Sequence, residues 1–158
     1  MFVGVQRCNG RGCLTCPALF NDSTIKVNDK KLELDGTLTC KDKNVIYVAQ
    51  CQLCPEGTDR DYIGQTGDAF HIRNNNHRSC FKTDTENDKK VYQLDALSQH
   101  WNDKHKDNAE RMEIFRLGIV KQTAAISLNE EEEKYCSCYK TQSNGLNRMT
   151  CGCGKAER

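Results

Sequence analysis

The sequence predicts a small α+β domain in which a central three-stranded antiparallel sheet is flanked by helices. The first observation is the order of patterns along the chain: two strand-like runs, two helical runs, one more strand-like run and a final helical run. The second is size, because 158 residues, of which 37% are hydrophobic, suit one domain with a modest core better than two domains. The third is the presence of 11 cysteines, which suggests that metal ions stabilise the fold.

Three runs have the composition of β-strands. The run at 45–50, inside NVIYVAQC, is rich in β-branched and aromatic residues, and the run at 61–65 begins the motif DYIGQT. The loop QLCPEGTD lies between them, so we expect these two strands to pair antiparallel. The third strand is expected at 112–119, where MEIFRLGIV alternates in polarity. A weaker hairpin is predicted in TIKVNDKKLEL, with its turn at Asn28 and Asp29.

Three runs with helical spacing complete the fold. Asp68 is expected to cap the first helix, because it follows a glycine that breaks the preceding strand. The second run carries apolar residues at helical spacing up to Trp101. The last opens on Ser127 and Glu130, which have the spacing of a capping box. The three helices are expected at residues 68–78, 90–104 and 127–141.

Charge and hydropathy narrow the class of protein. The net charge is +1, from 23 basic and 22 acidic residues, so a contact with nucleic acid must use a local patch. No run of 18 apolar residues occurs, and the start MFVGVQRCNG lacks the apolar core of a signal peptide. We therefore expect an intracellular protein with no membrane contact. Without an export signal the cysteines indicate metal ligation, and a disulfide-stapled secreted protein is the alternative.

One group of cysteines and histidines predicts a zinc site. Cys51 and Cys54 form a C-x2-C pair between the first two strands, and His100 and His105 have the spacing of a zinc-finger histidine pair. A tetrahedral zinc ion needs four such ligands, so we expect the two pairs to converge on one ion. The alternative is a buried thiol pair with two surface histidines.

A second group lies in the N-terminal part of the chain. Residues 1–43 are expected to form a Cys-containing segment, ahead of the main domain at 44–148 and a Cys-containing tail at 149–158. This segment has few apolar residues to fold around, so a second zinc ion would give it a core, although the sequence leaves this open. Its candidate ligands are Cys8, Cys13, Cys16 and Cys40.

The stretch DYIGQTGDAFHIRNNNHRS, at 61–79, concentrates polar and aromatic residues that are typical of a functional site. Tyr62 lies on the second predicted strand, and Tyr47 lies on the first, within VIY. Arg73 and His77 are four positions apart, so they share one face of the predicted helix. Two further pieces follow in the chain: Glu132 in the last helix and Asn147 in GLN.

This combination resembles the GIY-YIG endonuclease family, and most closely the type found in Penelope-like retroelements. The resemblance covers roughly residues 40–147, and its strongest part is the stretch at 61–79. Val45 stands where the family has its first glycine, and the Cys51 and Cys54 loop lengthens the span between the tyrosines. The family implies a metal-dependent DNA endonuclease that uses Mg²⁺ or Mn²⁺, with DNA as substrate. It also implies a nuclear location and a reverse transcriptase domain or protein as a partner.

The chemistry of phosphodiester hydrolysis fits these residue types. Tyr47 could accept a proton from water if nearby cations lower its pKa. Arg73 and His77 offer donors to phosphate oxygens. In the family the acidic residue corresponding to Glu132 holds the metal ion, and one carboxylate with waters suffices for Mg²⁺. Glu131 is the alternative ligand. The resemblance gives the catalytic set as Tyr47, Tyr62, Arg73, His77, Glu132 and Asn147.

Each of these residues also has an ordinary structural interpretation. A tyrosine on a strand is usually a core residue, and a run of glutamates at a helix start is usually solvated. The joint pattern favours the endonuclease. The alternative function is a zinc-stabilised DNA-binding or interaction module whose nuclease site is inactive.

Overall fold

The computed structural model describes Cys8 and residues 13–81 and 95–147. The start of the helix expected at 90–104 and the tail at 149–158 lie outside these residues. None of the helices in the described part of the chain is long and apolar enough to cross a membrane. The strands are β1 (Thr24–Val27), β2 (Lys30–Glu33), β3 (Val45–Cys51), β4 (Asp61–Thr66) and β5 (Phe115–Gln122), and the helices are α1 (Phe70–Ser79), α2 (Ala96–Lys104) and α3 (Leu128–Tyr139).

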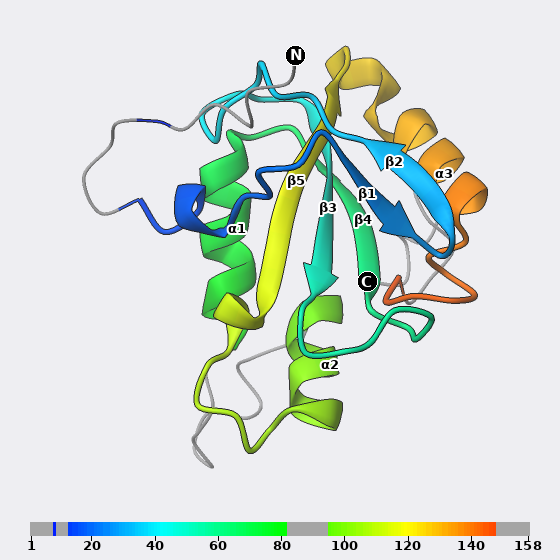
Figure 1. Cartoon of the computed structure of the whole chain (residues 1–158). Coiled ribbons are helices and arrows are strands. Elements are labelled where there is room, and N and C mark those ends of the chain that lie inside the picture. Colours follow the sequence, from blue (N-terminus) through cyan, green and yellow to red (C-terminus); the bar gives the residue numbers. More distant parts are fainter. Residues whose placement is uncertain (1–7, 9–12, 82–94, 148–158) are drawn as a thin grey trace.

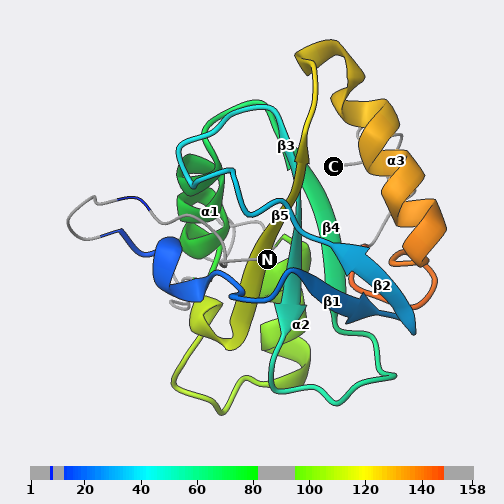
Figure 2. The same cartoon turned by 45° about the horizontal axis from the view of Figure 1, so that its top comes forward.

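The fold is α+β with a central sheet of three antiparallel strands, as the sequence predicted, and the strand order is β4-β3-β5. Both faces of this sheet are covered (Figures 1 and 2). Tyr47 and Ala49 of β3 belong to the core that includes residues of α1 and α2, whereas Ile46 and Val48 belong to the core shared with the β1-β2 hairpin and α3. Because neighbouring side chains of a strand point to opposite faces, every residue of β3 is buried.

The N-terminal hairpin is confirmed, with its turn where the sequence placed it. Asn28 and Asp29 have φ of 52° and 71°, the left-handed conformation that two-residue hairpin turns require and that Asn and Asp tolerate. The segments on either side of the hairpin lie along β5, with Phe20 N–H donating to the Leu117 carbonyl at 2.8 Å. This part of the chain therefore supplies side chains to both cores of the sheet.

The prediction that Asp68 caps α1 was wrong. The helix begins at Phe70 with no side-chain cap, because Asp68 is held in a turn in which its N–H donates to the Thr66 hydroxyl at 3.0 Å. The N–H groups of the first turn donate instead to backbone carbonyls: Phe70 N–H to Asp42 at 3.0 Å and His71 N–H to Cys40 at 2.7 Å. A distant loop thus replaces the local cap, which sequence spacing does not indicate.

The predicted capping box at Ser127 and Glu130 was also wrong. A 3-10 helix, Ala125–Ser127, runs directly into α3, and Ser127 makes no side-chain cap hydrogen bond. The Leu128 N–H donates to the Ala125 carbonyl, so backbone groups satisfy the start of α3. The third sheet strand begins later than predicted for a similar reason, because Met112–Ile114 form a 3-10 turn before β5.

Candidate active site and metal centres

The two tyrosines lie side by side on paired strands. Their ring centroids are 6.1 Å apart, and Gly64 is the register partner of Tyr47 on β4. A Cβ atom at Gly64 would lie 2.7 Å from Cζ and Oη of Tyr47 and 2.7 Å from Cε2 of Tyr62. The glycine of YIG is therefore required for the tyrosines to pack at this distance.

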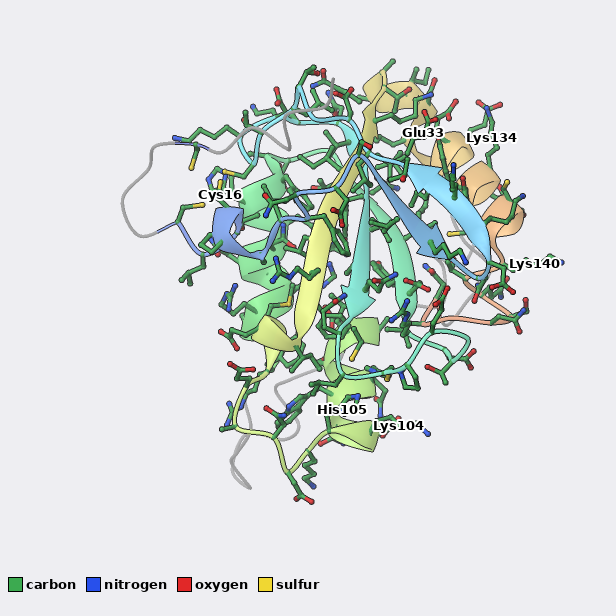
Figure 3. The ribbon with its side chains drawn as sticks, viewed as in Figure 1. Cys16, Glu33, Lys104, His105, Lys134 and Lys140 are labelled. Atoms are coloured by element: carbon green, nitrogen blue, oxygen red, sulfur yellow. The ribbon has the colours of Figure 1, made fainter. Side chains whose placement is uncertain are left out.

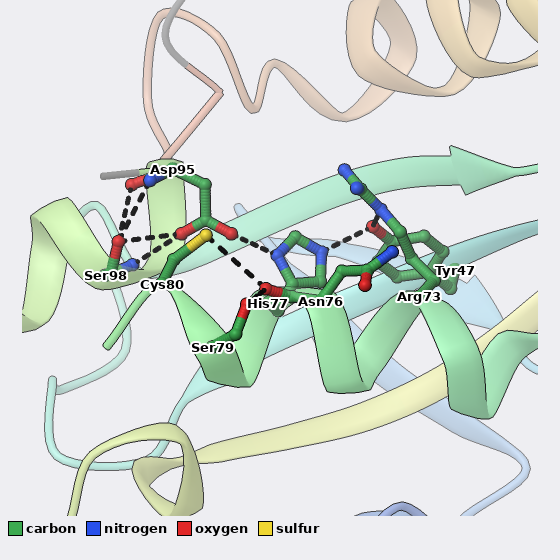
Figure 4. A network of polar contacts seen from close by, with 8 residues as sticks. All are labelled: Tyr47, Arg73, Asn76, His77, Ser79, Cys80, Asp95 and Ser98. Atoms are coloured by element: carbon green, nitrogen blue, oxygen red, sulfur yellow. Dashed lines mark hydrogen bonds and ion pairs between the residues drawn. The ribbon is translucent and has the colours of Figure 1, made fainter. Parts of the chain in front are cut away.

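Helix α1 directs Arg73 and His77 to the hydroxyl of Tyr47 (Figure 4). The Arg73 Nε–H donates to Tyr47 Oη at 3.1 Å, and His77 Nε2 lies 2.7 Å from the same oxygen. The His77 ring also lies edge-on to Tyr62, with centroids 5.8 Å apart. The two helical residues share one face, as their spacing predicted, and they converge on one oxygen atom.

Glu132 is a glutamate of α3 whose charge acts on both tyrosines. It is buried at 7% exposure, whereas Glu130 and Glu133 are exposed. Burial is the main cause that raises the pKa of Tyr47 and Tyr62, and the negative charge of Glu132 adds to it for both. Glu131, the alternative ligand, forms ion pairs with two lysines at 3.3 Å and points elsewhere. We call Tyr47, Tyr62, Arg73, His77 and Glu132 the tyrosine site.

Asn147 contacts the backbone of β4 rather than the Tyr47 hydroxyl. Its Oδ1 accepts from the Ile63 N–H at 3.0 Å, and its Nδ2 donates to the Ile63 carbonyl at 2.8 Å. The amide thus pairs with the backbone N–H and carbonyl on the outer edge of β4, as a neighbouring strand would. Gly145 permits this approach, because a Cβ there would lie 2.6 Å from the Thr141 carbonyl oxygen. Asn147 holds in place the strand that carries Tyr62.

The condition that nearby cations lower the pKa of Tyr47 overall is not met in this structure. Burial, with 0% of Tyr47 exposed, raises its pKa well above the ordinary value of 10. The charge of Arg73 opposes this change but does not overcome it. Tyr47 is therefore a neutral phenol at rest, because a buried phenolate loses more hydration than one arginine replaces.

Asp95 is the residue of this network that the sequence reasoning missed (Figure 4). Its carboxylate Oδ2 bonds to His77 Nδ1, and its Oδ1 accepts from the Ser98 N–H at 2.9 Å, which caps α2. The D-x-x-S spacing could have identified the cap, but no local pattern pairs Asp95 with His77. Burial lowers the pKa of His77, against the opposing effect of Asp95, so the imidazole is neutral at pH 7.

The predicted convergence of Cys51, Cys54, His100 and His105 is confirmed, and we call these residues the cysteine–histidine cluster. One ligand atom from each lies within 4.8 Å of the other three, so the group could hold a metal ion. Cys54 Sγ is 3.4 Å from His100 Nε2 and 3.3 Å from His105 Nε2. Burial lowers the pKa of His100 to about 4, which keeps its imidazole neutral and able to bind an ion.

Cys8, Cys13, Cys16 and Cys40 form a second such group, the four-cysteine cluster. Their sulfur atoms are separated by 3.6 Å for Cys8 and Cys16, 3.7 Å for Cys16 and Cys40, and 3.8 Å for Cys13 and Cys40. Disulfide sulfurs lie about 2.05 Å apart, so these pairs are not bonded to each other.

The two clusters occupy different places in the fold. Cys16 lies in the 3-10 turn Cys16–Ala18, whereas His105 lies at the end of α2 (Figure 3). Backbone groups already support the four-cysteine cluster, since Cys8 N–H donates to Cys16 Sγ at 3.2 Å and Cys16 N–H to Cys13 Sγ at 3.4 Å. Such bonds are the outer-shell contacts that orient metal-binding thiolates.

The chain was also compared with protein-family models, curated proteins and solved structures, and no match was found.

Proposed function

We propose that the protein is a metal-dependent DNA endonuclease of the GIY-YIG type, similar to those of Penelope-like retroelements. The observation that carries this proposal is the tyrosine site. Its five side chains come from two strands and two helices. Arg73 and His77 contact the Tyr47 hydroxyl, the Tyr62 ring packs against the Tyr47 ring, and the charge of Glu132 acts on Tyr47. A base, a fixed cation and a buried carboxylate at one place are the groups that phosphodiester hydrolysis needs.

Each member of the site has a distinct role in this proposal. Arg73 presents a planar guanidinium that bonds to Tyr47 through Nε at rest and can hold phosphate oxygens when DNA binds. Glu132 would hold Mg²⁺ or Mn²⁺, which fits the preference of these ions for one or two carboxylates and several waters. When bound, such an ion supplies positive charge for the phosphate and the leaving oxygen. Tyr62 packs against Tyr47 and His77 and limits how these rings can move.

Tyr47 would accept the proton of the attacking water. Because Tyr47 is fully buried, water reaches its hydroxyl only after a neighbouring side chain such as Arg73, which bonds to it, moves aside. A DNA phosphate attracts the Arg73 guanidinium away from the phenol, since a charge-assisted bond to phosphate is stronger than one to a neutral hydroxyl. Substrate binding therefore opens the site in this proposal.

Zinc is the ion that we propose for both clusters. With Zn–S of about 2.3 Å and Zn–N of about 2.0–2.1 Å, a tetrahedron has S···N edges of about 3.5 Å and S···S edges of about 3.8 Å. The observed S···N distances are 3.3–3.5 Å in the cysteine–histidine cluster, and the S···S distances are 3.6–3.8 Å in the four-cysteine cluster. The thiols of both clusters are free, which suits zinc ligation inside the cell, and the resemblance supports a nuclear location with a reverse transcriptase as partner.

Incubation of the zinc-loaded protein with supercoiled plasmid and Mg²⁺ or Mn²⁺ tests the function. We expect relaxed or linear plasmid, and none when the divalent ion is left out. Tyr47→Phe keeps the buried ring but removes the hydroxyl, so it should abolish cleavage. Tyr135→Phe, on the partly exposed face of α3, is the matched control and should cleave normally. Folded wild-type protein that leaves the plasmid supercoiled, or an active Tyr47→Phe variant, would refute the proposal.

The second candidate function is a zinc-stabilised DNA-binding or interaction module with an inactive site. One observation favours it: Tyr47 is completely buried and its pKa is raised. In that case a gel shift that weakens as salt increases should occur without any nicking. The plasmid experiment therefore separates the two functions.

A further inference from the structure

The polar network of the tyrosine site continues beyond His77 to a carboxylate whose position is fixed by a helix cap. Asp95 is the N-cap of α2, and its Oδ1 accepts from both the N–H and the hydroxyl of Ser98 at 2.9 Å. The Asp95 N–H donates in turn to the Ser98 hydroxyl at 2.9 Å. These bonds leave Oδ2 pointing at His77 Nδ1 (Figure 4).

This arrangement determines which nitrogen of His77 carries the proton. An ionised carboxylate only accepts hydrogen bonds, and hydrogen bonds to His77 and Ser98 hold the pKa of Asp95 below its ordinary value although burial acts against them. Nδ1 must therefore be the protonated nitrogen of the neutral imidazole, which leaves a lone pair on Nε2. Since the Arg73 Nε–H donates to Tyr47 Oη, the hydroxyl proton of Tyr47 points to His77 Nε2.

We propose that Asp95 is a positioning residue that holds His77 in the Nδ1-protonated tautomer, so that His77 Nε2 receives the Tyr47 hydroxyl proton during phosphodiester hydrolysis. This inference rests on the proposed endonuclease function. As water attacks phosphorus, its proton passes to Tyr47 Oη while the hydroxyl proton of Tyr47 passes to His77 Nε2. The new P–O bond forms, the bond to the leaving oxygen breaks, and that oxygen takes a proton from solvent. His77 later returns its proton to solvent.

A relay of this kind solves the problem that burial creates for Tyr47. A lone buried phenolate would be costly, because it loses its hydration and has one cation beside it. When both protons move together, the charge that appears in the site is an imidazolium next to the Asp95 carboxylate. Such a pair is stabilised where it forms, as in other catalytic networks that use an Asp to orient and support a histidine.

Asp95→Asn is the variant that tests the role of the carboxylate. Asn is an equally good N-cap, so its oxygen can keep the bond to the Ser98 N–H. Its NH₂ group then faces His77 Nδ1 and donates to it, which forces the proton onto Nε2. His77 can no longer accept from Tyr47. We expect kcat for plasmid nicking to fall by about 10²- to 10⁴-fold, the scale of losing the correct tautomer, while KM for DNA and the thermal midpoint change little.

The tautomer itself can be measured by ¹⁵N NMR of the His77 ring, without reference to cleavage. The wild-type ring should carry its proton on Nδ1, and Asp95→Asn should move it to Nε2. Asp68→Asn is the matched control, because it removes an exposed carboxylate just before α1 and should change neither kcat nor the tautomer. Asp95→Ser keeps a helix cap without a carboxylate, so it serves if the Asn variant does not fold.

The outcomes separate this inference from the function on which it rests. A wild-type ring protonated on Nε2, or an Asp95→Asn variant with unchanged kcat, overturns the role of Asp95 while plasmid nicking still supports the endonuclease. Wild-type protein that has the expected tautomer but nicks no plasmid overturns the endonuclease function and the proton relay with it. The assignment of the tautomer to Asp95 would then remain as a structural result.

Discussion

The cysteine–histidine cluster and the tyrosine site are connected through helix α2 but are built in opposite ways. In the cluster, thiol and imidazole atoms approach one another at 3.3–3.5 Å around a common centre. In the tyrosine site, the Tyr47 hydroxyl already has hydrogen-bond partners in Arg73 and His77. The cluster could therefore hold an ion as it stands, whereas the proposed function requires a substrate to displace part of the network around Tyr47.

Helix α2 joins the two regions. Asp95, at its start, belongs to the network of the tyrosine site, and His100 and His105 near its end belong to the cluster. A metal ion in the cluster would therefore fix the helix that positions His77. If each region has the role proposed for it, changes in the cluster should act on stability, and changes in the tyrosine site should act on cleavage.

The largest effect is expected from Cys54→Ser. This thiol lies within 3.4 Å of both histidines, so its loss would leave the proposed zinc ion with three protein ligands. We expect the free energy of unfolding to fall by at least about 4 kcal/mol, a part of the folding energy that a structural zinc supplies, with less effect on cleavage per folded molecule. Thermal unfolding and zinc content per chain would measure this.

Cys80→Ser is the matched control for that change. Cys80 is a partly buried thiol outside both clusters, so the variant should keep its full zinc content and nearly its full stability. A chelator should destabilise the wild-type protein and Cys80→Ser equally, but should affect Cys54→Ser much less. Equal stability of the wild type and Cys54→Ser would show that the cluster holds no structural ion.

Glu132→Gln should produce the next largest effect, and on cleavage rather than stability. Glutamine keeps the shape of Glu132 but cannot supply the negative charge that a divalent ion needs. Plasmid cleavage should fall at least about a hundredfold, or about 2.7 kcal/mol in the activation free energy. DNA binding should persist or tighten, since a negative charge that would face phosphate is gone.

Glu130→Gln tests whether the position of Glu132 matters, because Glu130 is an exposed glutamate at the start of the same helix. It should cleave plasmid nearly as well as the wild type. An equal loss in the two variants would mean that the general charge of α3, and not the buried carboxylate, supports activity. Zinc content should be unchanged in both.

The sequence predicted the cysteine clusters and the strands better than it predicted helix starts and network partners. The C-x2-C and H-x4-H spacings together predict that the four residues converge, because a tetrahedral ion needs all four ligands around one centre. The residues of β3 and β4 are also specified locally, by β-branched and aromatic side chains on a central strand. Asn28 and Asp29 likewise specified their own turn.

The features that the sequence did not predict depend on contacts between residues far apart in the chain. The start of α1 donates to carbonyls of the Cys40 to Asp42 loop, so Asp68 is not needed as a cap. His77 finds its partner in Asp95, which lies 18 positions later and on another helix. Likewise the pKa of Tyr47 depends on burial by several elements, which spacing cannot show.

Gly64→Ala should lower stability and cleavage together, because both tyrosines must move. The added methyl group would lie 2.7 Å from atoms of Tyr47 and Tyr62. We expect a loss of about 2 kcal/mol in the free energy of unfolding, typical of overpacking, and a lower kcat from the displaced Tyr47 hydroxyl. Gly67→Ala is the control, since its nearest neighbour would be 3.8 Å away. Equal behaviour of the two variants would show that the tyrosine packing is not restrictive.

The smallest effect concerns Asp61, which precedes Tyr62 on β4 but belongs to neither region. Burial raises its pKa to about 6, against the effect of the Gln50 amide that donates to it at 2.8 Å. A raised carboxyl pKa means that the folded state binds more protons than the unfolded state between about pH 4 and 6. Its contribution to stability is therefore greatest below about pH 4 and is lost as the pH rises to about 6.

Asp61→Asn should remove this pH dependence, because the amide does not titrate. Two pKa units correspond to about 2.7 kcal/mol, but the buried NH₂ group of Asn needs an acceptor and reduces the gain. We therefore expect the variant to be more stable than the wild type by about 1 kcal/mol at pH 7 and no more stable at pH 4. Urea unfolding at several pH values would measure it, with exposed Asp22→Asn as the control. Because Asp61 lies outside both regions, cleavage and zinc content should stay unchanged. A variant that gains no stability at pH 7 would show that ionising Asp61 does not destabilise the folded protein. A loss of cleavage would show that Asp61, at the start of β4, contributes to the tyrosine site.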